Sequence, residues 1–200
     1  MNELQKRRVK TVFKYTWPLY IVSTLIIVFG MNFLFQVTHR LPAYKSLTLF
    51  VSGQVTDDKK LTNDLLSKYQ DNELKNVSFV ECDPSDGSYL TRIKVVGYNS
   101  ADILIIPVSI LETKINCSAL AAELKDELIA DYYQGYTFYK ENDLNFGVKV
   151  DKEKVKTYMA LPNEDCYMLL NGASENLGEY SKKGVKERDN ALNVVKDWGI

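Results

Sequence analysis

The first forty residues contain one long apolar stretch that no charged residue interrupts. From Tyr15 to Thr38 the residues are mostly aliphatic or aromatic. A helix rises 1.5 Å per residue, and a hydrocarbon core of about 30 Å needs roughly 20 residues to cross it. Trp17 and Tyr20 stand at the start, where aromatic rings suit the lipid headgroup interface. The pattern predicts a transmembrane helix over residues 15–38, with the lipid bilayer as its partner.

The charges beside this stretch predict its orientation. Five basic residues precede it, namely Lys6, Arg7, Arg8, Lys10 and Lys14. Only Arg40 and Lys45 follow it closely. Because Lys and Arg are enriched on the cytoplasmic side of a span, we expect residues 1–14 in the cytoplasm and residues 41–200 outside the cell membrane.

A cleaved signal peptide is the alternative interpretation of the same stretch. Its apolar region usually covers about 7 to 15 residues and ends in a small-x-small cleavage site. The run here is longer, and the following segment VTHRLPAYK contains no A-x-A. We therefore expect an uncleaved anchor, a short tether over residues 39–45 and an extracytoplasmic domain over residues 46–200.

Beyond the tether, apolar runs alternate with amphipathic segments. Residues 46–53 and 75–82 have the composition of strands, and residues 57–70 carry leucines at helical spacing between them. A continuous aliphatic run over residues 103–106, closed by Pro107, is typical of a central parallel strand. Strands separated by helices predict an α/β fold, a single three-layer domain with a mostly parallel sheet.

The second half of the domain has a looser pattern. Leucines at helical spacing predict a helix over residues 118–133, and an amphipathic pattern predicts another over residues 181–198. Residues 136–151 alternate loosely, and residues 164–174 form a further strand candidate. These last two segments predict mixed or antiparallel additions at the edge of the sheet.

Composition and charge limit the function classes. With 46% apolar and 26% charged residues, the chain has the profile of a folded domain rather than a disordered or polytopic membrane protein. Residues 41–200 carry 19 Lys and Arg against 25 Asp and Glu. Nucleic-acid binding needs a basic surface, so no nucleic acid is expected as a partner.

The order of these segments resembles a known family. LTLFVSG, then VSFVEC, a polar turn and SADILIIPVSIL look like the first lobe of extracellular solute-binding proteins with the type 2 periplasmic-binding fold. FGVKVD and CYMLLNGASENLG are similar to segments of small membrane-anchored relatives in Gram-positive bacteria. The resemblance implies a central third strand beside a ligand cleft. Solute-binding proteins close two lobes on a ligand, whereas this chain has room for one.

Catalytic chemistry finds little support in the residue types. His39 is the only histidine and lies at the end of the apolar stretch, so a His-based triad or zinc site inside the domain is excluded. Nucleophile-elbow, P-loop and dinucleotide patterns are absent. Cys82, Cys117 and Cys166 either include one disulfide or are all buried small hydrophobes. We expect no enzyme activity, no cofactor and no metal.

Candidate ligand residues lie where the strands end, because open α/β sheets often bind ligands there. They are Ser52, Gly53, Asp83, Asp86, Ser88 and Ser109. Turn formation and helix capping explain the aspartates equally, and their spacing is not that of an EF-hand loop. Asp102, at the start of the third strand, is expected to be structural.

A tyrosine group is the other candidate contact surface. Tyr132, Tyr133, Tyr136 and Tyr139 follow or end the helix expected at residues 118–133. A tyrosine ring can stack on a sugar or a partner, or it can pack in the core. The sequence thus leaves three hypotheses: an interaction domain with a membrane or envelope protein partner, a sensor or transporter accessory for a small polar ligand such as a sugar or peptide, and a structural assembly component.

Overall fold

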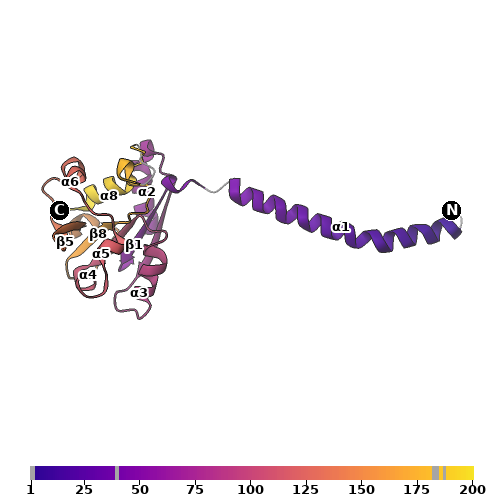
Figure 1. Ribbon diagram of the computed structural model, residues 1–200, viewed down its shortest axis with the longest axis horizontal. Coiled ribbons are helices and arrows are strands. Elements are labelled where there is room, and N and C mark those ends of the chain that lie inside the picture. The colour runs from indigo at the N-terminus through magenta and orange to yellow at the C-terminus, as the bar shows by residue number, and fades with distance from the viewer. Residues whose placement is uncertain (1–2, 39–40, 182–184, 187) are drawn as a thin grey trace. The chain divides into compact units, whose positions relative to one another are not determined.

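The structure is a computed structural model that describes residues 3–38, 41–181, 185–186 and 188–200. It divides into two compact units, Met1–Leu41 and Pro42–Ile200. The first contains the helix α1, Glu3–Thr38 (Figure 1). Between Lys6 and Phe35 this helix is long and apolar enough to cross a membrane, a property that a signal sequence shares.

The second unit is an α/β domain. Its strands are β1 (Ser46–Ser52), β2 (Gln54–Val55), β3 (Asn76–Cys82), β4 (Ile103–Pro107), β5 (Phe138–Glu141), β6 (Leu144–Lys149), β7 (Met159–Ala160) and β8 (Cys166–Leu170). Its α-helices are α2 (Asp58–Lys68), α3 (Tyr89–Arg92), α4 (Val108–Lys114), α5 (Cys117–Leu120), α6 (Asp126–Tyr132), α7 (Lys152–Val155) and α8 (Asn190–Trp198). Short 3₁₀ turns lie at η1 (Ala43–Lys45), η2 (Gln70–Asn72) and η4 (Gly178–Tyr180), and a π-helix lies at η3 (Ile93–Gly97).

Six strands form the main sheet in the order β3-β1-β4-β8-β6-β5. β1 is parallel to both β3 and β4, whereas the pairs β4–β8, β8–β6 and β6–β5 are antiparallel. The predicted α/β class and the antiparallel additions are confirmed. The expectation of a mostly parallel sheet is wrong, because β8 returns directly against β4 without a crossover helix.

The sheet separates two hydrophobic cores, because alternate residues of a strand point to opposite faces. Leu49 of β1 and Ile105 of β4 join the core under α2, α6 and α8, while Phe50 and Leu104 join the core under α3, α4 and α5. Figure 1 shows helices above and below the strands. Every residue of β4 is buried, as its aliphatic run predicts.

Two predicted helices have different bounds. The segment expected to be helical over residues 118–133 breaks between α5 and α6. There Ala122 donates its N–H to the Leu170 carbonyl at 2.7 Å, and Leu124 donates to Asn145 at 2.7 Å. These bonds to β8 and β6 replace helical ones, so tertiary pairing overrides the leucine spacing.

The last helix is shorter than the sequence predicts. It begins at Asn190 rather than at residue 181, and Val185 lies before it. The Arg188 carbonyl accepts a hydrogen bond from Gly178 instead of from the next helical turn. Residues 182–184 and 187 of the predicted helix lie outside the described residues. Leu192, Val195 and Trp198 are buried on one face, as expected.

Candidate functional site

The carboxyl ends of β1 and β3 bring two predicted ligand residues together. Gly53 and Asp83 line one open hollow of about 470 Å³, together with Ser85 and residues 160–162. Gly53 has a φ of 149°, and a Cβ at this position would stand 2.2 Å from the Ala160 carbonyl oxygen. Glycine is therefore needed here so that β2 can pair with β7. The close approach of two backbones explains this residue without a ligand.

Ser52 does not face that hollow. Its side chain is fully buried, and its hydroxyl lies 2.5 Å from the Tyr89 hydroxyl. Burial is the main cause that raises the pKa of Tyr89. The two hydroxyls hold the end of β1 against α3 and are not available to a ligand.

The loop after β3 forms two side-chain turns. Asp83 Oδ1 accepts hydrogen bonds from the Ser85 N–H at 2.8 Å and the Ser85 hydroxyl at 2.7 Å. Asp86 Oδ1 accepts one from the Ser88 N–H at 2.8 Å. These bonds stabilise the ionised carboxylates and lower the pKa of both aspartates. The arrangement is the Asx-turn alternative that the sequence left open.

Ser109 lies in the first turn of α4, and Glu164 holds it there. The Glu164 carboxylate accepts the Ser109 N–H at 2.9 Å and the Ser109 hydroxyl at 2.8 Å. The free N–H groups of a first helical turn attract such a carboxylate. Ser109 is therefore part of a helix cap in this structure.

The tyrosines fasten α8 to the rest of the domain. Tyr132 donates its hydroxyl to Asp189 at 2.9 Å, Tyr133 donates to the Leu192 carbonyl at 3.1 Å, and Tyr136 donates to the Lys196 carbonyl at 2.8 Å. Tyr133 is fully buried, which raises its pKa. Tyr139 packs instead against Tyr167, with ring centroids 5.5 Å apart. The core interpretation fits this group better than an exposed stacking surface.

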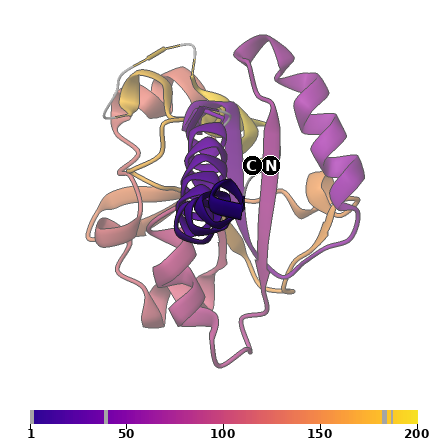
Figure 2. The same ribbon diagram turned by 90° about the vertical axis from the view of Figure 1, so that its right-hand side faces the viewer.

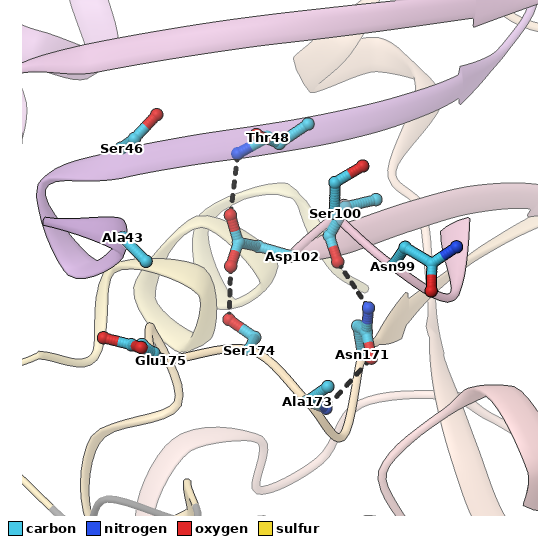
Figure 3. A pocket seen from close by; sticks show the side chains of 11 residues that line it. Ala43, Ser46, Thr48, Asn99, Ser100, Asp102, Asn171, Ala173, Ser174 and Glu175 are labelled. Carbon is cyan, nitrogen blue, oxygen red and sulfur yellow. Dashed lines mark hydrogen bonds between the residues drawn. The ribbon is translucent and has the colours of Figure 1, made fainter. Parts of the chain in front are cut away.

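A polar pocket lies at the opposite end of the sheet, where β1 and β4 begin and β8 ends (Figure 3). It encloses about 420 Å³. Its polar lining residues are Ser46, Thr48, Asn99, Ser100, Asp102, Asn171, Ser174 and Glu175. They come from three segments far apart in the chain, so no short motif in the sequence marks the pocket.

Asp102 organises this pocket, which we call the Asp102 pocket. Its carboxylate accepts the Thr48 N–H at 2.7 Å, the Ser174 hydroxyl, and the Asn176 amide at 3.2 Å. The side chain is almost completely buried, and this burial raises the pKa of Asp102 although the three donors act in the opposite direction. The expectation of a structural role for Asp102 agrees with these contacts.

Asn171 closes the neighbouring loop. Its side-chain amide donates to the carbonyls of Gly97 at 2.8 Å and Ala101 at 2.7 Å, and its Oδ1 accepts the Ala173 N–H at 2.9 Å. Ser100 and Asn99 at the rim donate to carbonyls of η3 at 3.1 and 2.9 Å. The polar groups of the pocket are therefore engaged within the chain, although their hydroxyl and carbonyl oxygens keep further acceptor capacity.

The same network holds the segment that follows the apolar helix. Asn176 donates to the Ser46 carbonyl at 2.9 Å, and Asn190 donates to the Tyr44 carbonyl at 3.4 Å. The Arg188 guanidinium lies 3.6 Å from the centre of the Tyr44 ring. Lys45 forms an ion pair with Glu73 at 2.8 Å. Residues 43–46 are thus bound to the loop after β8, to the start of α8 and to η2's end.

Reactive groups are few in the described part of the chain. Cys82, Cys117 and Cys166 are buried and free, and burial raises the pKa of Cys117 to about 12 and that of Cys166 to about 11. Thiols with raised pKa values are poor nucleophiles at neutral pH. Among the described residues no group of three His, Cys, Asp or Glu side chains is placed to hold a metal ion.

No protein-family model, curated protein or solved structure matches this chain. The resemblance to solute-binding proteins therefore stays a prediction.

Proposed function

We propose that this chain is a single-pass, membrane-anchored, non-catalytic domain that acts outside the cytoplasm by contacting another membrane or envelope protein. The apolar helix between Lys6 and Phe35 supports the anchor, and the basic residues before it support a cytoplasmic N-terminus. The protein is then related in architecture to one lobe of a solute-binding protein, without a second lobe that closes on a ligand.

The docked tether is the observation that carries this proposal. Residues 43–46 are fixed to the domain, so only residues 39–42 separate the end of α1 from ordered contacts. A short connection keeps a domain near the membrane and raises its effective concentration toward other membrane proteins. The predicted ligand residues, in contrast, have partners within the chain.

In-cell photocrosslinking tests the proposal. Val95 on η3 and Leu144 on β6 have 59% and 41% of their surface exposed, which makes them suitable sites for a photoreactive residue in the full chain. We expect a discrete crosslinked protein from at least one site in the cells that make the chain. Repeated absence of any crosslinked protein from both sites would contradict the proposal.

A small-ligand function is the second candidate, because the Asp102 pocket has the volume of a small-molecule site. Its lining carries Asp102 and Glu175 and no basic side chain, so a neutral or cationic ligand with hydrogen-bond donors, such as a sugar, would fit. A screen of thermal unfolding with sugars, amino acids and short peptides tests this candidate. Ser100→Trp should abolish a specific shift by filling the pocket, whereas Thr113→Trp on exposed α4 should keep it.

A further inference from the structure

The strand β3 forms one outer edge of the main sheet and carries no feature that blocks pairing. It pairs only with β1, in an unbroken register of seven residues from Asn76 to Cys82. The other edge strand, β5, has four residues and a register shift between Tyr139 and Lys140. Long, regular edge strands are templates for pairing with another chain. Figure 2 shows β3 as a long straight strand beside α2.

The hydrogen bonds around β1 show which groups of β3 face outward. Thr48 exchanges both of its backbone bonds with Asp102, on the β4 side. Backbone groups of successive strand residues point to alternate sides, so Val51 and Gly53 face β3, and the Gly53 N–H reaches the Cys82 carbonyl at 3.2 Å. On β3 the outward backbone groups are therefore those of residues 77, 79 and 81.

One contact confirms this alternation. The Glu81 carbonyl accepts a hydrogen bond from the Arg92 guanidinium at 3.2 Å rather than from β1. The backbone groups of Val77 and Phe79 point in the same direction. The described part of the chain places no strand against them.

We propose that β3 pairs antiparallel with β3 of a second copy of this chain, with Ser78 opposite Ser78 on the two-fold axis. In this register Lys75 of each copy stands opposite Glu81 of the other, and Val77 stands opposite Phe79. Lys75 and Glu81 are exposed. Opposite charges and apolar pairs directly across two strands are stabilising, so the strand is complementary to itself.

Neighbouring registers are less favourable. A centre at Val77 places Glu81 opposite Glu73 of the second copy, which are like charges. A centre at Phe79 places Glu81 opposite Val77. The charge pattern of the strand thus selects Ser78 as the centre.

The pairing is compatible with two anchors in one bilayer. Thr48 is the register partner of Ser78, and Ser46 lies two residues before it. With a strand spacing of about 4.8 Å and a rise of about 3.3 Å per residue, the two Ser46 positions are about 20 Å apart. The dimer gives the interaction domain of the proposed function a partner and rests on that proposal only for this membrane argument.

Charge reversal of the full chain in detergent or nanodiscs is the first test, with light scattering or native mass spectrometry as the readout. Lys75→Glu and Glu81→Lys should each raise the dimer dissociation constant about tenfold or more, because two attractive pairs become repulsive. The double variant Lys75→Glu with Glu81→Lys should restore the wild-type value. Lys140→Glu, on the opposite edge strand, is the matched control and should change nothing.

Cysteine crosslinking tests the register directly. Residues facing each other in a non-hydrogen-bonded antiparallel pair have Cα atoms about 4.5 Å apart, within disulfide range. Ser78→Cys should therefore form a disulfide-linked dimer, while the wild type with its three buried thiols should not.

A monomeric wild-type chain, or a dimer that survives both charge reversals, would overturn the inference. If the wild type is monomeric but photocrosslinking captures another protein, the inference fails and the proposed function stands. If no protein of any kind is captured and no dimer forms, both fail. The charge variants alter exposed side chains, so they decide the question even if Ser78→Cys does not fold.

Discussion

Thr48 and Asp102 exchange two hydrogen bonds at the junction of the first and third parallel strands. The Asp102 N–H donates to the Thr48 carbonyl at 2.8 Å, and the Asp102 carboxylate accepts the Thr48 N–H at 2.7 Å. The side chain thus takes the place of a backbone acceptor one position before the β1–β4 ladder begins at Leu49 and Ile103. This pair joins the domain's first strand to the network that holds the tether.

Asp102→Asn should lower the free energy of unfolding by about 1–3 kcal/mol, because its amide nitrogen meets a donor and leaves buried groups without an acceptor. Denaturant unfolding of the full chain in detergent measures this change. Glu112→Gln, on the exposed side of α4, is the control and should be within about 0.5 kcal/mol of wild type. Equal stabilities of the Asp102 variant and the control would show that the network does not hold the strands.

The effect of Asp102 should depend on pH. Burial raises its pKa in the folded state above the ordinary 3.8, so the folded state holds this proton more tightly than the unfolded state. Stability from this group is therefore complete below about pH 4 and declines as the pH rises through the folded-state pKa. The stability difference between wild type and Asp102→Asn should be largest in acid and shrink with increasing pH. A difference that grows with pH would contradict the direction of the shift.

Gly53→Ala should be severely destabilising, by about 2 kcal/mol or more, because the new Cβ would overlap the Ala160 carbonyl and the φ of 149° is unsuited to alanine. Thermal unfolding compares it with Gly87→Ala, whose Cβ would meet no atom within 4 Å. Similar midpoints for the two variants would mean that β2 and β7 do not pair as described.

Tyr133→Phe separates the packing role of the tyrosines from a binding role. Loss of the hydrogen bond to the Leu192 carbonyl should cost about 1 kcal/mol of unfolding free energy, because that carbonyl is left without this donor. Denaturant unfolding should show the loss in the full chain without any ligand. An unchanged stability would reopen the stacking interpretation.

The sequence predicts the first half of the domain well, because local pattern and tertiary structure agree there. The runs at 46–53, 75–82 and 103–107 correspond to β1, β3 and β4 almost residue by residue. The pattern fails between Ala121 and Leu124, where leucine spacing is helical but the backbone pairs with strand ends. Such pairing depends on residues distant in the chain and leaves no local trace.

The candidate site shows the same limit. Ser52 and Ser109 carry groups suited to ligands, and only coordinates reveal that Tyr89 and Glu164 engage them. The Asp102 pocket gathers residues 43–48, 99–102 and 171–175, and only Asp102 stands out in the sequence, as a charge before an aliphatic run. Buried asparagines such as Asn176 give no signal of their own.

Labelling of intact cells tests the central claim, a domain displayed outside the membrane, most directly. The native thiols are buried, so Glu112→Cys would supply an accessible one on the exposed side of α4. A membrane-impermeant maleimide should label this variant in intact cells as fully as in lysed cells, and should leave the wild type unlabelled. Labelling that requires lysis would place the domain in the cytoplasm and contradict the account.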